Sequence, residues 1–199
     1  VNPEPTRWDG ALLPFAAQDL PTLLAEVAAQ RRPVKAITMA EAVLSDGQRL
    51  RGVNDLFIGP RSHTSAWYDI ALGEQRETQS SSGVIVSTGL GSTAWLKSVL
   101  TGSIGVAAAL QPGRAPACPT QPWDSAQLTF VVREPFPTRS SQASLVYGTV
   151  TAQQPLTLCS RMPEHGVIFS DGMEADFLRF TAGMTATIRV ADRRGQLVM

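Results

Sequence analysis

Apolar residues first recur at helical spacing near the start of the chain. Three leucines, a valine and an alanine lie three or four residues apart within 20–28, which would make one face of a helix apolar. Asp19 is placed as the N-cap, Pro21 lies in the first turn, and Arg31 and Arg32 precede Pro33. The pattern predicts one amphipathic helix that ends before Pro33.

Beyond Pro33, short apolar runs separated by turn residues predict strands. The runs are 34–44, 50–58, 66–72, 83–87, 127–132, 144–150, 156–159, 167–170, 177–180 and 185–190. Asp46–Gly47 and Asp171–Gly172 have the composition of hairpin turns. A second, short helix is predicted from Thr93 to about Leu100, and the prolines of 111–123 indicate an irregular loop. This order predicts a mainly β fold, a β-sandwich, rather than alternating βαβ units.

The segment 82–95, Ser-Gly-Val-Ile-Val-Ser-Thr-Gly-Leu-Gly-Ser-Thr-Ala-Trp, is the strongest candidate binding site. An apolar strand leads into a turn in which Gly89 and Gly91 allow backbone angles that side chains forbid. Ser92 or Thr93 is placed to cap the helix that follows. Unpaired N–H groups at such a helix start attract phosphate, ribose or carboxylate oxygens.

Two common nucleotide motifs do not fit this segment. Gly89-Leu-Gly-Ser-Thr-Ala94 matches the dinucleotide pattern G-x-G-x-x-A, but that motif needs an acidic residue about 20 residues further on. The stretch 107–119 contains no Asp or Glu. No Gly-Lys-Ser/Thr follows the glycines, which excludes a P-loop. An ordinary glycine turn between a strand and a helix remains the plainest alternative.

Three motifs resemble the signature segments of the NAD kinase family, within the diacylglycerol kinase-like superfamily. Segment 82–95 resembles the family's strand and Ser-Thr-Pro-x-Gly-Ser/Thr-Thr-Ala-Tyr turn. Val53–Ile58 resembles its Asn-Glu/Asp pair inside a strand, and 167–172 with 184–190 resembles its late Asp-Gly hairpin and closing strand. The order and spacing also agree with the family, from about Val34 onward. The resemblance implies the family's β-rich, NAD-binding C-terminal domain.

The resemblance also implies roles for particular residues. Asp55 would accept the ribose hydroxyl protons of NAD, and Asn54 would bond the adenine edge; a carboxylate suits a vicinal diol because it offers acceptors and no donor. Ser82, before the strand, would face the nicotinamide end of the ligand. The remaining candidates would lie at the turn and the first helical turns against the nucleotide, and they are Gly91, Ser92, Thr93, Ala94, Trp95 and Ser98. The family reaction transfers a phosphoryl group from ATP, with magnesium, to the ribose hydroxyl of NAD and gives NADP.

The sequence departs from the family in ways that bear on the substrate. Ser82 stands where the family has an Asp near the nicotinamide, and Gly89–Leu90 replaces Pro-x. Trp95 replaces a Tyr that reaches a neighbouring subunit's nucleotide site, so its indole keeps a ring to stack but loses the phenol oxygen. A lipid or sugar kinase fragment and a non-catalytic nucleotide sensor therefore stay open as alternatives.

The chain lacks the Gly-Gly-Asp-Gly motif whose Asp, in the family's N-terminal α/β domain, is assigned to activating the acceptor hydroxyl. We expect a C-terminal part of a longer protein, with 1–33 as linker and helix from the domain junction and 34–199 as the NAD-binding β-sandwich. No catalytic residue is expected in this chain, which alone would be inactive.

Composition is that of an ordinary globular domain, with 199 residues, 43% hydrophobic, 17% charged and a formal net charge of zero. The balance of charge argues against nucleic acid as a partner, and the longest apolar stretch, 104–110, is too short to span a membrane. Cys118, Cys159, His63 and His165 lack metal-ligand spacing, so no metal site is expected. We expect reduced cysteines, a cytoplasmic location and, from the resemblance, a homo-oligomer.

Overall fold

The computed structural model describes residues 1–7, 13–111 and 116–199. The predicted linker and the predicted proline-rich loop include residues 8–12 and 112–115, which lie outside this described part. The chain forms two compact units. One comprises Val1–Ile37 with Gly195–Met199, and the other comprises Thr38–Arg194.

The smaller unit contains the predicted amphipathic helix. A short 3-10 helix, Ala17–Asp19, leads into α1, Leu20–Ala28, in which Pro21 occupies the first turn. Asp19 is the N-cap residue but makes no side-chain cap bond, and its carboxylate instead accepts the backbone N–H of Ala16 at 2.9 Å. Strand β1, Val34–Ile37, pairs antiparallel with β14, Gly195–Val198. The sequence pattern did not indicate β14.

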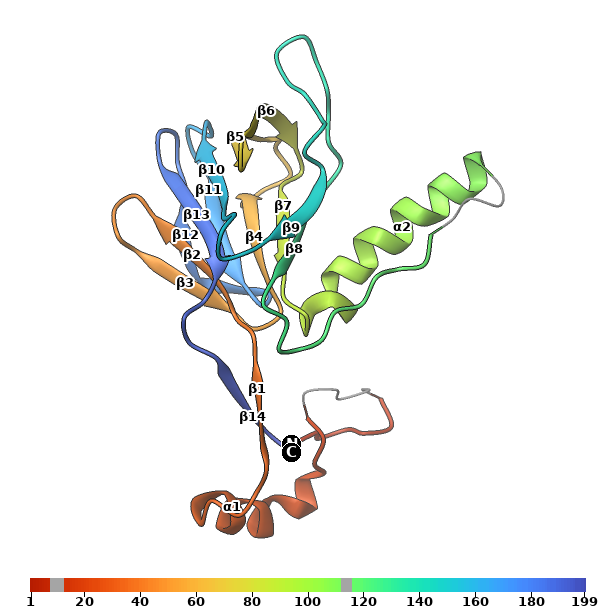
Figure 1. Cartoon of the computed structure of the whole chain (residues 1–199), viewed down its shortest axis with the longest axis vertical. Coiled ribbons are helices and arrows are strands. Elements are labelled where there is room, and N and C mark those ends of the chain that lie inside the picture. Colours follow the sequence, from red (N-terminus) through yellow and green to blue (C-terminus); the bar gives the residue numbers. More distant parts are fainter. Residues whose placement is uncertain (8–12, 112–115) are drawn as a thin grey trace. The chain divides into compact units, whose positions relative to one another are not determined.

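The larger unit is a sandwich of two antiparallel sheets (Figure 1). The first sheet has the order β3-β2-β13-β10-β5-β6, with bounds Arg49–Gly52, Ala40–Leu44, Thr185–Val190, Leu156–Ser160, Ala66–Leu72 and Gln75–Ser81. The second has the order β12-β11-β4-β7-β8-β9, with bounds Met173–Arg179, Gly166–Ser170, Asp55–Pro60, Val84–Ser87, Leu128–Val132 and Tyr147–Val150. The prediction of a mainly β sandwich is confirmed.

Alternation along the strands divides the apolar residues between two layers. Leu56 and Ile58 of β4 and Val84 and Val86 of β7 face inward and join the main core between the sheets. Phe57 points to the opposite face of the second sheet and joins a smaller cluster that includes the following side chains: Ile85, Leu96, Val131 and Val167. The first turns of α2, Trp95–Leu110, cover this outer face.

The sequence pattern missed one whole strand of the first sheet. Strand β6 has the polar sequence Gln-Arg-Glu-Thr-Gln-Ser-Ser, yet Glu77 and Gln79 on one of its faces are buried. The Glu77 carboxylate accepts the backbone N–H of Leu145 at 2.8 Å, and Gln79 accepts the hydroxyl of buried Tyr68 at 2.9 Å. Buried polar side chains satisfied in this way replace apolar ones, so hydrophobic alternation gives no indication of the strand.

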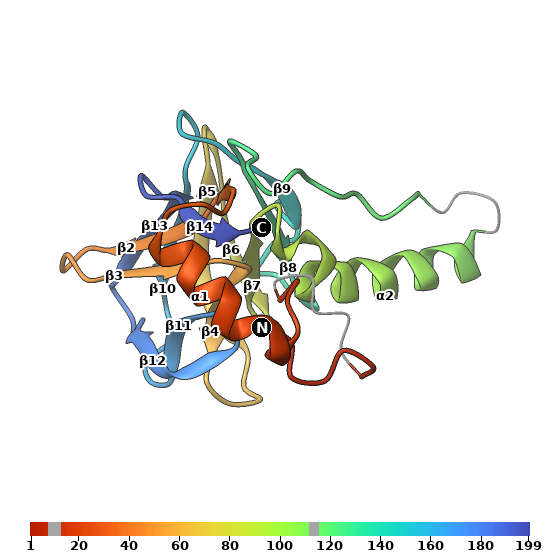
Figure 2. The ribbon, with the colours of Figure 1, turned by 90° about the horizontal axis from the view of Figure 1, so that it is seen from below.

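Helix α2 is longer than predicted. It begins at Trp95 rather than Thr93 and continues to Leu110, although Gly102 and Gly105 lower the intrinsic preference for helix. No atom crowds either glycine, and the hydroxyls of Thr101 and Ser103 bond back to carbonyls one turn earlier. The far half of α2 extends away from the strands (Figures 1 and 2). No helix among the described residues is long and apolar enough to cross a membrane.

Candidate functional site

Asn54 and Asp55 lie where the chain enters the central strand β4. Asp55 is the first residue of the strand and is only 4% exposed, while Asn54 is half-buried. Alternation places Asp55 on the outer face of the sheet together with Phe57, the face that α2 covers. The sequence prediction of a carboxylate within an apolar strand is therefore correct, and this carboxylate is buried.

The Asp171 carboxylate holds the backbone that carries this pair. Its Oδ2 accepts the N–H of Val53 at 2.8 Å, and its Oδ1 accepts those of Asn54 at 2.6 Å and Asp55 at 3.2 Å. Asp171 and Gly172 have φ of 53° and 72°, the left-handed conformation of the predicted hairpin turn between β11 and β12. The turn was predictable from the Asp-Gly pair, but its carboxylate contacts were not.

The glycine-rich turn packs against the same backbone from the other side. The Thr88 hydroxyl donates to the carbonyl of Val53 at 2.6 Å, and the Thr88 N–H donates to that of Asn54 at 2.9 Å. A Cβ on Gly91 would lie 2.0 Å from the Asn54 carbonyl oxygen. Segments 53–55, 88–91 and 171–172, which are far apart in the sequence, therefore meet at one place.

The glycines of this turn serve a purpose different from the one predicted. Neither Gly89 nor Gly91 has a positive φ. Both allow another backbone segment to approach closely instead. A Cβ on Gly89 would lie 1.9 Å from the Pro122 carbonyl oxygen, and a Cβ on Gly91 would collide in the same way with the Asn54 carbonyl oxygen. The predicted cap is also wrong: the N-cap of α2 is Ala94, with no side-chain cap bond, and the Ser92 hydroxyl donates to the Gly89 carbonyl at 2.7 Å.

Burial and a neighbouring negative charge raise the pKa of the Asp55 carboxyl group. Burial removes water that would stabilise the ionised form, and the Asp171 carboxylate adds like-charge repulsion, which together raise the pKa of Asp55 to about 6. Among the described residues no hydrogen bond to the Asp55 carboxylate is formed. A buried acceptor of this kind favours a ligand that supplies O–H or N–H donors.

A row of polar side chains continues from Asp55 across the outer face of the sheet. Asp55 pairs with Ser87 of β7, Ser87 pairs with Thr129 of β8, and Gln121 donates to the Thr129 hydroxyl at 2.7 Å. The Gln121 Oε1 is buried and has no hydrogen-bond partner in the described part of the chain. Sequence reasoning missed Gln121 because it lies in a segment read only as an irregular loop.

The predicted residues after the turn differ in their availability to a ligand. Thr93, Ala94 and Ser98 are exposed, and the Ser98 N–H donates to the Ala94 carbonyl at 3.2 Å, so the two residues lie one helical turn apart as predicted. Ser92 is buried and its hydroxyl is bonded within the turn. Trp95 is half-buried and stacks on Phe57 of the same chain, with ring centroids 5.5 Å apart.

Ser82 lies away from this cluster. It precedes β7, whereas Thr88 follows it, and an extended run from Ser82 to Ser87 covers roughly 16 Å. Its N–H donates to the carbonyl of Arg133, whose guanidinium lies 5.4 Å from the centre of the Trp95 ring. Ser82 therefore lies on the side of β7 toward which the Trp95 indole extends.

Comparisons with known proteins bear on the fold. No protein-family model matches the chain, and no curated protein has a significantly similar sequence. Among solved structures, the chain is similar to the crystal structure of yeast NADH kinase complexed with NADH, with a TM-score of 0.66 and 17% sequence identity. The match covers 95% of this chain and 51% of the kinase, so the chain spans about half the length of that protein.

This likeness concerns the fold: the mainly β sandwich of this chain has the architecture of part of the yeast kinase. More narrowly, the chain has an NAD kinase-like fold.

Proposed function

We propose that this chain is the nucleotide-binding domain of an NAD kinase-like phosphotransferase, with NAD or NADH as the acceptor. The observation that carries the proposal is Asp55, a buried carboxylate without a described hydrogen bond at the meeting point of segments 53–55, 88–91 and 171–172. The similarity of fold to an NADH kinase complexed with NADH supports a ligand of this class. Two acceptor oxygens on one carboxylate suit ligands with paired hydroxyls, such as ribose.

Asp55 and Asn54 would recognise the adenosine half of the ligand. The Asp55 carboxylate offers two acceptor oxygens, which matches the two donor hydroxyls of a ribose diol. Its raised pKa means that the carboxylate is ionised at neutral pH but carries an electrostatic penalty. Hydroxyl donors from a ligand would relieve that penalty, so part of the binding free energy would come from satisfying Asp55.

The start of α2 would bind a second part of the ligand. Gly91 lies against the backbone of Asn54, and Thr93 and Ala94, which follow it closely in the sequence, are exposed and present backbone and small side chains. Ser98 and Trp95 line a hollow of about 640 Å³ between α2 and the segment 132–135. A ring of the ligand would find the apolar wall that stacking requires there.

Phosphoryl transfer from ATP to a ribose hydroxyl of NAD is the reaction that the resemblance implies. Such a step needs a base within hydrogen-bond reach of the hydroxyl and a means to neutralise the phosphate charge. Among the described residues no group of three His, Cys, Asp or Glu side chains is arranged to hold a metal ion. We therefore assign no residue of this chain to magnesium and route no catalytic step through it.

A homo-oligomer is also proposed. The far half of α2 carries apolar residues that are open to solvent, with Val106 62% and Leu110 78% exposed. Apolar helix surface of this kind favours burial against a partner. Size-exclusion chromatography with light scattering tests the point, and a monomer over the whole concentration range would contradict it.

The function is tested by binding and turnover on the same preparation. The 199-residue chain is mixed with ATP, magnesium and NAD, and NADP formation is measured beside direct titration with NAD. We expect saturable binding without turnover, because the Gly-Gly-Asp-Gly base is absent from this sequence. Sustained turnover would make Asp55 the first candidate for the base. Failure to bind any nucleotide would overturn the proposal in favour of a lipid or sugar kinase fragment.

One observation on the gene separates the kinase from a nucleotide sensor. A Gly-Gly-Asp-Gly motif encoded upstream of Val1 would favour the kinase, and an upstream domain without it would favour the sensor.

A further inference from the structure

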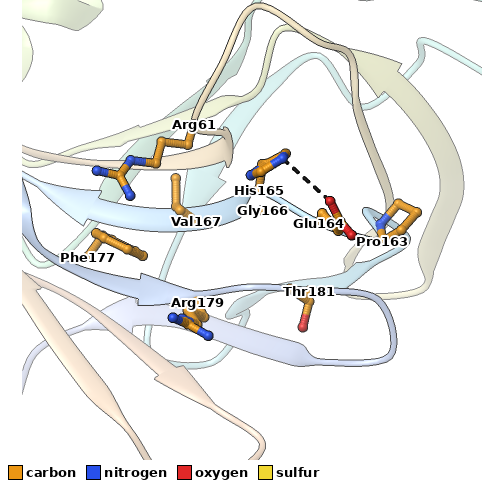
Figure 3. A pocket seen from close by; sticks show the side chains of 9 residues that line it. All are labelled: Arg61, Pro163, Glu164, His165, Gly166, Val167, Phe177, Arg179 and Thr181. Atoms are coloured by element: carbon orange, nitrogen blue, oxygen red, sulfur yellow. Dashed lines mark ion pairs between the residues drawn. The ribbon is translucent and has the colours of Figure 1, made fainter.

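A second hollow lies on the outer face of the second sheet, at the edge formed by β4, β11 and β12. It measures about 310 Å³, at the lower end of the range for ligand sites. Side chains that line it come from the end of β4, the start of β11 and the end of β12 (Figure 3), and they include Arg61, His165, Val167, Phe177, Arg179 and Thr181.

Strand register explains why these side chains share one face. Val167 of β11 lies opposite Gly59 of β4 on one side and opposite Arg179 of β12 on the other. Residues two apart point to the same face, so Arg61 continues the row of Gly59 and Phe177 continues the row of Arg179. Gly59 has no side chain, and the Phe57 ring occupies the space that a Cβ there would fill, so the hollow lies beyond Gly59, between Arg61, Val167 and the row of Arg179.

The hollow has a cationic part and an apolar part. Arg61 and Arg179 line it, and within the described residues neither guanidinium forms an ion pair with a carboxylate. The guanidinium carbon of Arg61 lies 4.8 Å from the centre of the Phe177 ring, a cation–π contact that holds the side chain over the pocket. Val167 and Phe177 form the apolar wall beside these charges.

The loop that closes the hollow has a strained backbone. His165 has φ of 61°, a conformation uncommon for a residue with a side chain, and its carbonyl accepts the N–H of Arg61 at 2.7 Å. Glu164 is a carboxylate at the pocket, but it is 81% exposed and lies 3.6 Å from the His165 ring (Figure 3). The acidic side chain is thus directed to His165 and leaves both arginines free.

This hollow is separate from the nucleotide site. Asp55 begins β4 and Arg61 follows its last residue, so the two sites lie at opposite ends of the strand, roughly 20 Å apart. A ligand here would not compete with contacts to Asp55.

We propose that the hollow binds a phosphate monoester carried on a flat apolar ring. Two unpaired guanidinium groups match the charge of a phosphate dianion, and the planar fork of each one donates paired hydrogen bonds to phosphate oxygens. Val167 and the Phe177 edge supply the surface on which the ring packs. The arginines would bind the phosphate and the apolar wall would bind the ring, so both parts of the ligand contribute to affinity.

The probe for this site is phenyl phosphate, titrated into the uniformly ¹⁵N-labelled chain. We expect saturable shifts of the backbone amides of residues 165–167 and 177–181, with weaker binding of inorganic phosphate. Arg61→Gln and Arg179→Gln should each weaken phenyl phosphate at least about tenfold, since each removes a charged donor pair. Arg139→Gln, an exposed arginine elsewhere on the unit, is the matched control and should leave the affinity unchanged.

Three results would overturn the proposal. The first is no saturation with phenyl phosphate, and the second is shifts confined to residues outside the hollow. The third is wild-type affinity for phenyl phosphate in either arginine variant, or equal affinity of the wild type for phenyl phosphate and inorganic phosphate. Both arginines are exposed, so the variants are expected to fold, which the amide spectrum shows directly.

Discussion

The Asp171 carboxylate accepts the backbone N–H of Asn54 at 2.6 Å, across a separation of 117 residues. One hairpin turn therefore fixes the backbone of the strand that carries both adenosine-binding candidates. The same carboxylate repels the negative charge of Asp55. Position and electrostatics at the site both depend on Asp171.

Asp171→Asn should destabilise the fold by about 1–3 kcal/mol, because hydrogen bonds from three backbone N–H groups to a charged acceptor are weakened. Removal of the negative charge should also lower the pKa of Asp55. Urea unfolding measures the first effect, and carboxyl ¹³C titration by NMR measures the second. Asp46→Asn, in the other Asp-Gly hairpin, is the control and should change little. An equal loss of stability in Asp171→Asn and Asp46→Asn would contradict the role of Asp171 as the anchor of the 53–55 backbone.

Gly91→Ala should destabilise the chain by about 1–3 kcal/mol, because its Cβ would lie 2.0 Å from the Asn54 carbonyl oxygen. Gly102→Ala in α2 is the matched comparison, since no atom lies within 4 Å of its Cβ. That change should stabilise the helix by about 0.5–1 kcal/mol. Thermal unfolding of the two variants would contradict the account if their midpoints moved in the same direction.

Glu77→Gln tests the buried polar strand β6. Burial opposes ionisation of Glu77, but hydrogen bonds from Gln79, Leu145 and Ser144 outweigh it, and the pKa of Glu77 is lowered. A lowered pKa adds stability above the unfolded value and loses it as the pH falls through the folded value. The variant should be less stable at pH 7, by about 1–3 kcal/mol. The difference should shrink below about pH 4.5, and urea unfolding at both pH values measures it.

The sequence was sufficient to predict the elements whose pattern is local. The Asp171–Gly172 turn follows from its composition, and the strand of Asp55 follows from the apolar residues around it. The contacts that assemble the site were not predictable, because Asp171 and Thr88 act on a backbone segment far from them in the sequence. Gly91 was identified for the wrong reason, since close approach depends on the partner segment rather than on φ.

Polar residues in buried positions account for two further failures. Strand β6 has no apolar alternation because Glu77 and Gln79 are buried through hydrogen bonds. Gln121 is brought to the site by a loop without periodicity, and its place follows from two long-range hydrogen bonds, which its side chain donates to Thr129 and its backbone N–H donates to the Ser92 hydroxyl. The hydrophobic pattern predicts which faces of an element are buried. It fails where the buried side chains are polar and hydrogen-bonded.

Asp55→Asn should make the unliganded chain more stable at pH 7.5, by about 1–3 kcal/mol, because burial and Asp171 raise the pKa of Asp55 to about 6. A raised carboxyl pKa penalises folding above the folded value, and the penalty disappears as the pH falls toward the unfolded value of 3.8. The variant's advantage should therefore shrink between pH 6 and pH 4. A variant less stable than wild type at pH 7.5 would contradict this electrostatic account.

Calorimetric titration with NAD tests whether Asp55 binds the nucleotide, with wild type, Asp55→Asn and Asp46→Asn compared at pH 7.5. We predict saturable binding to wild type and to Asp46→Asn, and a loss of about 1.5–3 kcal/mol of binding free energy in Asp55→Asn. Wild-type affinity should fall as the pH drops below about 6, where Asp55 takes up a proton. Equal NAD affinity in wild type and Asp55→Asn would contradict the assignment of Asp55 to the nucleotide site.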